Sequence, residues 1–419
     1  MTLLSLAAKS LANRRFTSIL TVSTIALSVL LLLGVERMRT EAREAFTSTV
    51  SGTDLIVGAR SGAVQLLLYS VFHIGSATSN ITWQSYRDIA ALPGVAWTVP
   101  ISLGDSHRGH RVMGTEAAFF EHYRYARDRR VAFAAGSTFD DLYDAVLGAE
   151  VAARLGYRIG EALVIAHGAG SASVLDHGDK PFRVAGILER TGTPVDRTVI
   201  VSLAGIEAIH ADWAGGVPVP GRRLDADAVR ELDLTPDAIT AVLVGLSSRV
   251  HTFRVQRLVN EYPGEPLLAI LPGVTLAELW NVMGVVEGAL MAISVLVVLV
   301  GLGGMVTALV TGLNERRREI AVLRSVGARP WQVLGLLVVE AMFLAAAGIV
   351  IGLLLLYAVI GTAGGALESH LGFSPAWRMP GLVEWLMLGG VLAAALLAGL
   401  VPGMRAYRYS LSDGLALRL

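Results

Sequence analysis

The chain has 419 residues, of which 53% are apolar and 17% charged, and its 35 basic and 35 acidic residues give a formal net charge of zero at pH 7. A balanced charge without a basic stripe argues against nucleic acid as a partner. The sequence contains no cysteine, which excludes disulfides, thiolate metal sites, cysteine nucleophiles and iron–sulfur clusters.

Four apolar runs without a charged residue dominate the sequence, one near its start and three in its last third. A helix needs roughly 20 apolar residues to cross a bilayer, and each buried charge at its centre would cost ~2.5–3.5 kcal/mol. We therefore predict four transmembrane helices, over residues 16–36, 285–313, 333–363 and 384–402. The first run is longer than the core of a signal peptide and lacks a small-x-small cleavage site, which favours a retained anchor over a cleaved leader.

Basic residues predict the orientation of these helices. Eleven of them lie before the first span, between the second and third, or after the fourth, whereas the short loop 364–383 carries only Arg378. The positive-inside rule then places residues 1–15, which we expect to form an amphipathic helix, the segment 314–330 and the tail 403–419 in the cytoplasm. Residues 37–284 would lie outside a cytoplasmic (inner) membrane, in a periplasm where one exists.

This large domain has the composition of a soluble protein and a mixed α/β pattern. We expect it to contain two subdomains, and the run of glycine and proline from Gly215 to Gly221 to be a flexible tip or linker. Strands are expected at 53–57, 95–103, 182–188, 198–201 and 241–246, and helices at 82–92 and 250–262.

Residues 58–80 form an apolar segment whose role the sequence leaves open. It is too short to span a membrane and contains His73 and several small residues. It could cap an apolar substrate, insert at the membrane surface, pack across a dimer, or fill the core of its own domain.

Six histidines of the large domain raise the possibility of a zinc site. Imidazole is a good zinc ligand, but structural sites usually have four ligands at defined short spacings, and only His107 and His110 lie close together. We therefore assign no metal site and keep a metal-binding module as an alternative. The histidines considered are His73, His107, His110, His122, His167 and His177.

The sequence contains no catalytic motif for hydrolysis. Its two lysines, Lys9 and Lys180, lie outside the glycine-rich context that a P-loop requires. No Ser-His-Asp order and no H-E-x-x-H motif occurs either. We predict that the chain is not an enzyme, and that a separate subunit supplies ATP hydrolysis if ATP powers its work.

The most specific stretch is NERRREIAVLRSVGARPWQVLGLLVVEAMFLAAAGIVIG, from Asn314 to Gly352. Charged residues begin a helix where the second span ends, and Ile320 and Leu323 make a short apolar stripe at helical spacing. Gly327 and Pro330 then stop this helix. The pattern predicts a short amphipathic helix between two spans.

This stretch resembles the signature N-E-R-x-x-E-I-x-x-L-x-x-x-G-A of the MacB/FtsX/LolC-type permease family, whose members are mechanotransmitting ABC permeases. SLAAKSLANRRFTSILTVSTIALSV and LLAGLVPGMRAYRYSLSDGLA are similar to the family's first and last spans with their flanks. The resemblance implies four transmembrane helices and an extracytoplasmic domain made of a porter-like part and an inserted β-rich subdomain.

The resemblance also implies partners. Such permeases dimerise, and each pairs with an ATP-binding subunit that holds ATP and magnesium and docks on the helix between the second and third spans. A homodimer is favoured here and a heterodimer is possible. On this basis six residues would couple the chain to the ATPase: Glu315, Arg316, Arg317, Glu319, Arg324 and Gly327. The alternative is that these arginines only set the topology.

The third span contains Glu340, Gly348 and Gly352. A carboxylate near the bilayer suggests proton relay, but we favour a polar contact to a neighbouring helix because the family usually has an acid here. The two glycines form a G-x-x-x-G pair that permits close approach of helices, either within the chain or between two chains.

We therefore predict a permease subunit that exports or extracts a hydrophobic or amphipathic molecule such as a lipid, lipoprotein, peptide or drug. Membrane lipid and a periplasmic or outer-membrane protein would be further partners. An adaptor that activates an extracytoplasmic hydrolase is an alternative function, and this chain itself would hold no cofactor.

Overall fold

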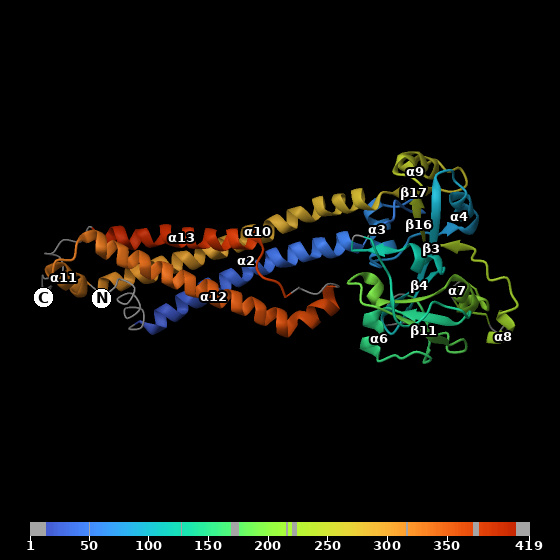
Figure 1. The fold of residues 1–419 in the computed structure, drawn as a ribbon, viewed down its shortest axis with the longest axis horizontal. Coiled ribbons are helices and arrows are strands. Elements are labelled where there is room, and N and C mark those ends of the chain that lie inside the picture. Colours follow the sequence, from blue (N-terminus) through green and yellow to red (C-terminus); the bar gives the residue numbers. More distant parts are fainter. Residues whose placement is uncertain are drawn as a thin grey trace. The chain divides into compact units, whose positions relative to one another are not determined.

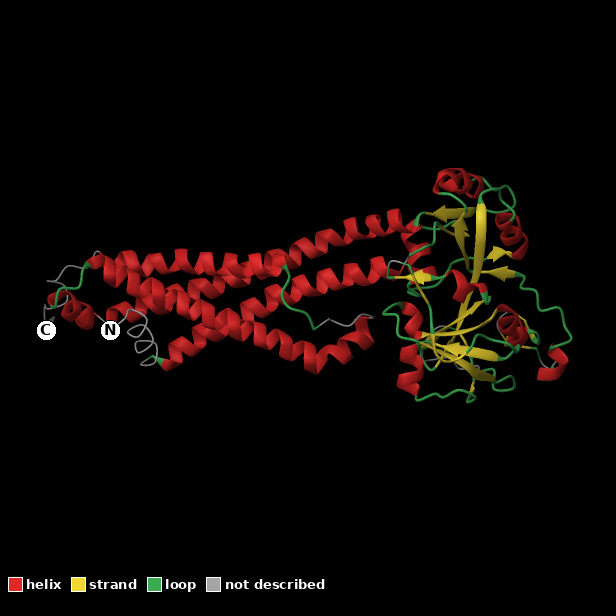
Figure 2. Ribbon diagram, viewed as in Figure 1, coloured by secondary structure: helices red, strands yellow, loops and turns green. Residues whose placement is uncertain are grey.

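The computed structural model describes residues 14–407, except for 50, 127, 169–175, 215–216, 220–223, 316 and 372–376. The predicted helix over residues 1–15 and the tail 403–419 therefore lie largely outside the described residues. The chain divides into two compact units, Met1–Ala42 with Gly284–Leu419, and Arg43–Met283. Figures 1 and 2 show the helices of the first unit and the α/β fold of the second.

Long helices build the first unit. Helices α2 and α10 come from its two chain segments, and α12 and α13 follow α10, with the short α11 before α12. Among the described residues, these four long helices are the ones that have the length and hydropathy to cross a membrane, which confirms the predicted fold class. Their bounds are α2 Arg15–Thr49, α10 Pro272–Glu315, α11 Arg317–Ser325, α12 Pro330–Leu371 and α13 Leu382–Tyr407.

The helix α10 begins well before the predicted span at 285. Pro272 stands at its first position, where the fixed φ of proline suits a helix and no amide hydrogen is needed. Residues 273–284 then continue as helix without a further proline. Hydropathy identifies the apolar run from residue 285, but it does not identify the less apolar helical turns before it.

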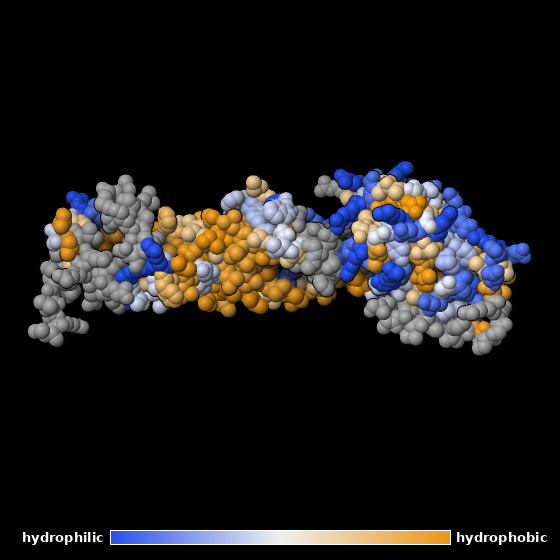
Figure 3. Space-filling model, turned by 90° about the horizontal axis from the view of Figure 1, so that it is seen from below, coloured by the Kyte–Doolittle hydropathy of each residue, from blue (hydrophilic) through white to orange (hydrophobic). Residues whose placement is uncertain are grey.

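The four helices expose apolar side chains along their outer faces. Leu296, Leu354 and Leu397 are each more than 60% exposed, although they lie in the middle of apolar helices. Figure 3 shows this surface as a broad orange area over the helices. An apolar surface of this size suits lipid and not water. The protein is therefore a multi-pass membrane protein.

An eleven-stranded sheet organises the second unit. Its strand order is β17-β1-β16-β3-β4-β12-β8-β11-β7, with β10 paired to β3 and β9 paired to β11. The bounds are β1 Leu55–Ala59, β3 Val95–His107, β4 His110–Thr115, β7 Phe133–Gly136, β8 Asp144–Leu147, β9 Ala162–Leu163, β10 Ala166–His167, β11 Phe182–Leu188, β12 Thr198–Ser202, β16 Ala241–Leu246 and β17 Leu267–Ile270.

Short helices and two-residue strands connect these strands. Ser202 caps α7 by accepting a hydrogen bond from the Gly205 amide, and Thr82 caps α4 in the same way. The helices are α3 Ala63–Val71, α4 Trp83–Ala90, α5 Ala118–His122, α6 Ala149–Leu155, α7 Leu203–His210, α8 Ala226–Val229 and α9 Thr252–Asn260, with 3-10 turns at Pro194–Arg197 and Arg249–His251. The small strands are β2 Ile81–Thr82 with β15 Ala238–Ile239, β5 Arg124–Tyr125 with β6 Arg129–Arg130, and β13 Trp213–Ala214 with β14 Val217–Pro218.

Two of the hydrophobic cores on this sheet are each formed mainly by one part of the domain. Residues from both ends of the domain sequence, including Leu55 and Val244, form one core. The inserted part, including Val184 and Ile209, forms another. The strand β3 belongs to both parts, because its first half pairs with β16 and its second half with β4. The inserted part thus has its own core but shares one hydrogen-bonded sheet.

The apolar segment 58–80 packs into its own domain. Its middle part forms α3, whose Leu66 and Leu67 are fully buried in a third core together with Tyr69 and Phe72. Of the four interpretations open from sequence, the geometry favours a segment that fills the domain core. The predicted linker at 215–221 lies mostly outside the described residues, and its described part includes β14.

Candidate functional site at one end of the helix bundle

The short helix α11 connects the end of α10 to the start of α12. Gly327 ends it with a φ of +103°, a conformation that is unstrained only for glycine. Pro330 then begins α12, and the Gln332 side chain accepts a hydrogen bond from the Arg329 amide at 2.8 Å. The sequence thus produces a helix, a sharp turn and a new helix within a few residues.

The apolar face of α11 packs on the ends of three long helices. Ile320, 7% exposed, lies in a small core with Leu313 of α10, Val333 and Leu337 of α12, and Ala406 of α13. On its opposite side Val322 is 52% exposed, and Val326, in the turn that follows the helix, is 83% exposed. The helix therefore has one face joined to the bundle and one face available for a partner.

The structure describes the six predicted coupling residues unequally. Gly327 and the partly buried Arg324 lie at the end of α11. The backbones of Glu315, Arg317 and Glu319 lie in α10 and α11, and their side chains are outside the described parts of the chain. Arg316 lies outside the described residues altogether.

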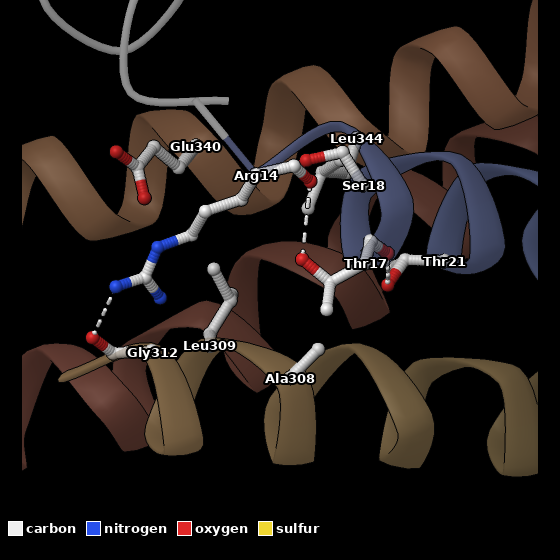
Figure 4. A pocket seen from close by; sticks show the side chains of 9 residues that line it. All are labelled: Arg14, Thr17, Ser18, Thr21, Ala308, Leu309, Gly312, Glu340 and Leu344. Carbon is white, nitrogen blue, oxygen red and sulfur yellow. Dashed lines mark hydrogen bonds between the residues drawn. The ribbon is translucent and has the colours of Figure 1, made fainter. Parts of the chain in front are cut away.

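A small pocket next to this end of the bundle contains Glu340. The carboxylate is 1% exposed and shares the pocket with Arg14, which stands just before α2 (Figure 4). The Arg14 guanidinium donates a hydrogen bond to the Gly312 carbonyl of α10 at 2.9 Å. The pocket measures about 30 Å³ and is lined by Arg14, Thr17, Ser18, Thr21, Ala308, Leu309, Gly312, Glu340 and Leu344.

This arrangement joins three helices through polar groups. Arg14 bridges α2 and α10, and Glu340 brings α12 to the same place. A carboxylate and a guanidinium that line one small pocket carry opposite charges, which suits polar contacts between helices. Sequence analysis considered Arg14 only as a topology signal, since nothing in the linear order connects it with Gly312.

The glycine pair of the third span faces α2 of the same chain. A Cβ at Gly348 would lie 2.6 Å from a methyl group of Ile25, and a Cβ at Gly352 would lie 2.8 Å from the Ala26 carbonyl oxygen. These distances are too short for any side chain, so α12 and α2 approach closely because both positions are glycine.

A buried ion pair that the sequence did not reveal lies at the other end of these helices. The Arg37 guanidinium of α2 contacts the Glu384 carboxylate of α13 at 3.1 and 3.2 Å, and both side chains are less than 5% exposed. Glu384 also accepts a hydrogen bond from the Gly381 amide, and Arg37 lies over the Tyr357 ring of α12. Because both residues stand just outside the apolar runs, hydropathy alone passes over them.

Four of the six histidines considered from sequence have separate partners. His107 is held between the Val164 carbonyl and the Tyr157 hydroxyl, His110 contacts the Arg197 carbonyl, and His122 stacks on Trp97. His73 contacts the Thr198 hydroxyl. His167 and His177, in contrast, come together with Asp105 and His210, two residues that sequence analysis did not single out.

Comparison with protein families identifies both parts of the chain. A model described as "MacB-like periplasmic core domain" matches residues 18–260, which is more than half of the sequence. A model described as "FtsX-like permease C-terminal" matches residues 291–411, which include most of α10 and all of α11, α12 and α13.

Curated relatives include an uncharacterized ABC transporter permease of Methanocaldococcus jannaschii, 25% identical over 54% of this chain and 51% of that protein. The macrolide export ATP-binding/permease protein MacB of Nitrobacter winogradskyi is 36% identical over 30% of this chain and 19% of that protein. MacB of Marinobacter nauticus is 33% identical over 32% of this chain and 19% of that protein. The chain thus spans about half, or less, of the length of these relatives.

Solved structures with partial likeness are the periplasmic region of MacB from Actinobacillus actinomycetemcomitans and the extracellular domain of the transporter YknZ from Gram-positive bacteria. Both are 12% identical, with TM-scores of 0.33 and 0.31 over 55% and 52% of this chain, and over 94% and 98% of theirs. On the strength of the two family models, the chain belongs to the MacB/FtsX-type family of ABC transporter permeases.

Proposed function

We propose that this permease couples ATP hydrolysis on an ATP-binding subunit to movement of its α/β domain, and so exports or extracts a hydrophobic or amphipathic molecule. Family membership supports the permease role. The ATP-binding partner, the coupling route and the class of substrate are our proposals.

The packing of α11 is the observation that carries the proposal. Ile320 inserts among residues from α10, α12 and α13, so a displacement of α11 moves the ends of three membrane helices together. Close-packed side chains transmit such a displacement because the interior has little compressibility. The exposed side of α11 with Val322, together with Val326 in the turn after it, is then the surface for the ATP-binding subunit.

Nucleotide binding by the chain itself would need a different set of residues. Lys180 is fully buried and its ammonium contacts the Asp212 carboxylate at 2.7 Å, so it is held in a structural ion pair. Lys9, the other lysine, lies outside the described residues. We infer that ATP and magnesium bind to the partner.

The orientation follows from the same proposal. An ATP-binding subunit works in the cytoplasm, so α11 and both chain ends would be cytoplasmic and the α/β domain extracytoplasmic, in a cytoplasmic membrane. A second permease chain, identical or related, would complete the transporter. Two relatives are named for macrolide export, which supports our proposal that drugs are among the candidate substrates.

A pull-down of the tagged permease from its native cells in mild detergent tests the proposal. We expect an ATPase to co-purify with the native chain and to be lost with the triple variant Glu315→Ala/Arg316→Ala/Glu319→Ala. The control variant Arg254→Ala/Arg257→Ala/Glu261→Ala removes three exposed charges from α9 and the residue that follows it, and should retain the ATPase. If the native chain brings down no ATPase activity, the transporter proposal is wrong.

A further inference from the structure

Four side chains of the α/β domain converge at one place where the sheet is irregular. Asp105 lies in β3 at a break in strand register, and His167 of β10 stands directly opposite it. His210 is the last residue of α7, and His177 lies beside Ile165, whose carbonyl accepts the His177 amide. One potential ligand atom from each residue lies within 4.8 Å of the others.

Three of these atoms are spaced as ligands of one metal ion. His167 Nδ1 lies 3.1 Å from His210 Nε2 and 3.3 Å from Asp105 Oδ1, and the last two atoms are 3.7 Å apart. Zinc–nitrogen bonds of about 2.0–2.1 Å in a tetrahedron would separate the ligands by about 3.3–3.4 Å. The point equidistant from the three atoms in their plane lies about 2.0 Å from each of them.

The hydrogen bonding of His210 leaves its Nε2 without a proton and therefore able to bind a metal. Its Nδ1 lies 2.9 Å from the Ile206 carbonyl, which can only accept a hydrogen bond, so Nδ1 carries the proton. Its Nε2, which faces Asp105 and His167, then has a free electron pair. A histidine that binds a metal through one ring nitrogen usually donates a hydrogen bond from the other, often to a backbone carbonyl.

The unpaired ring of His177 is a second, independent indication that this place binds a ligand. Its side chain is fully buried, and neither ring nitrogen has a hydrogen-bond partner among the residues that the structure describes. A buried polar group that is left unpaired destabilises the fold, so a bound ligand would compensate for this cost. The ring of Trp213 packs on the ring of His177, with 4.3 Å between the two ring centroids, and shields it from water.

We propose that Asp105, His167, His177 and His210 bind one Zn²⁺ ion in the α/β domain. Three imidazoles and one carboxylate provide the nitrogen and oxygen ligands that zinc accepts, and four protein ligands make a closed, structural site. Such an ion ties β3, β10 and the end of α7 together, and it satisfies the buried nitrogen of His177. His167, which is partly exposed, leaves a path for the ion to enter.

Metal analysis of the full chain in detergent tests this site. After treatment with a chelator and addition of Zn²⁺ alone, we expect about one zinc per chain to survive desalting, and the thermal unfolding temperature to rise. Replacement of zinc by Co²⁺ should give the intense visible absorption of a four-coordinate ion.

Two ligand variants and one control assign the zinc to these residues. Asp105→Asn and His210→Gln should each weaken zinc binding by at least about 100-fold. His210 is partly exposed, so its variant keeps the test valid if Asp105→Asn fails to fold. The control His110→Gln changes another buried histidine of the domain and should bind zinc as the native chain does. The proposal is overturned if the native chain retains no zinc, or if His210→Gln retains as much as the native chain.

Discussion

Arg37 and Glu384 illustrate how charges can reside within a membrane protein. Each is almost fully buried, and each stabilises the other through two contacts. Breaking a buried pair by removing one partner usually costs about 3–5 kcal/mol, because the remaining charge has no partner in a medium of low dielectric constant.

We expect Arg37→Met to lower the thermal unfolding temperature of the detergent-solubilised protein strongly, and Glu384→Gln to do the same. The double variant Arg37→Met/Glu384→Met should be more stable than Arg37→Met alone, since it leaves no isolated charge. Arg230→Met is the control, because both partners of the Arg230–Asp141 pair are about 40% exposed, and removal of one partner of such a pair leaves a charge that water can solvate. Equal losses for Arg37→Met and Arg230→Met would contradict this interpretation.

His73 makes the stability of the domain depend on pH. Burial, and then the positive charge of Arg111, lower its pKa to about 4 in the folded chain, against about 6.5 when unfolded. The unfolded chain therefore binds a proton first as the pH falls. The contribution of the neutral His73 to the free energy of unfolding is fully present above pH 6.5. It is lost between pH 6.5 and 4, by at most about 3 kcal/mol.

His73→Asn should reduce this dependence. Asparagine tolerates the left-handed backbone at this position, φ 55°, and its side chain can still donate a hydrogen bond. Unfolding curves of the full chain at pH 7.5 and pH 5 would be compared for both proteins. We expect the native chain to lose more stability on acidification than the variant, and an identical loss would show that His73 does not titrate in this range.

At the scale of elements, the contact between α12 and α2 depends on two glycines. A methyl group at Gly348 would overlap with Ile25, and overpacking of this kind usually costs about 1–3 kcal/mol. We expect Gly348→Ala to lower the unfolding temperature. Gly303→Ala is the matched control, because no described atom lies within 4 Å of a Cβ there. A Gly348→Ala protein as stable as the control would indicate that the helices separate at little cost.

The elements that sequence predicts best are those whose pattern is decided locally. β11 and β16 have the predicted bounds, because their side chains alternate in burial or form one apolar run. The long helices follow from apolar length alone. β3 continues beyond its predicted end at 103 to His107, since its second half is stabilised by pairing with β4 and not by its own polar sequence.

The sites that sequence misses are made of residues from distant segments. Arg37 and Glu384 are 347 positions apart, and only the packing of α2 against α13 brings them together. The four residues at the irregular point of the sheet come from β3, β10, the segment before β11 and α7. Their spacing along the chain resembles no metal motif, so nothing in the linear sequence groups these four residues.

At the scale of the whole molecule, the proposed orientation can be tested with single cysteines, because the native sequence has none. Val326→Cys lies in the turn after α11, and Val250→Cys in the α/β domain, and the replaced side chains are 83% and 86% exposed. We expect a membrane-impermeant maleimide to label Val250→Cys on intact spheroplasts, and Val326→Cys only after permeabilisation. The opposite pattern would reverse the orientation, and with it the place of the ATP-binding subunit.

The strand β3, shared by both parts of the sheet, has a mechanical consequence. A hinge between the two parts would have to separate β3 from β16 or from β4, and so break a row of backbone hydrogen bonds. We therefore expect the sheet to move as one rigid body, so that a force applied at one edge also displaces the opposite edge. The sheet should be weakest at the register break between Leu103 and Ser106, and a metal ion bound by Asp105 would stabilise it there.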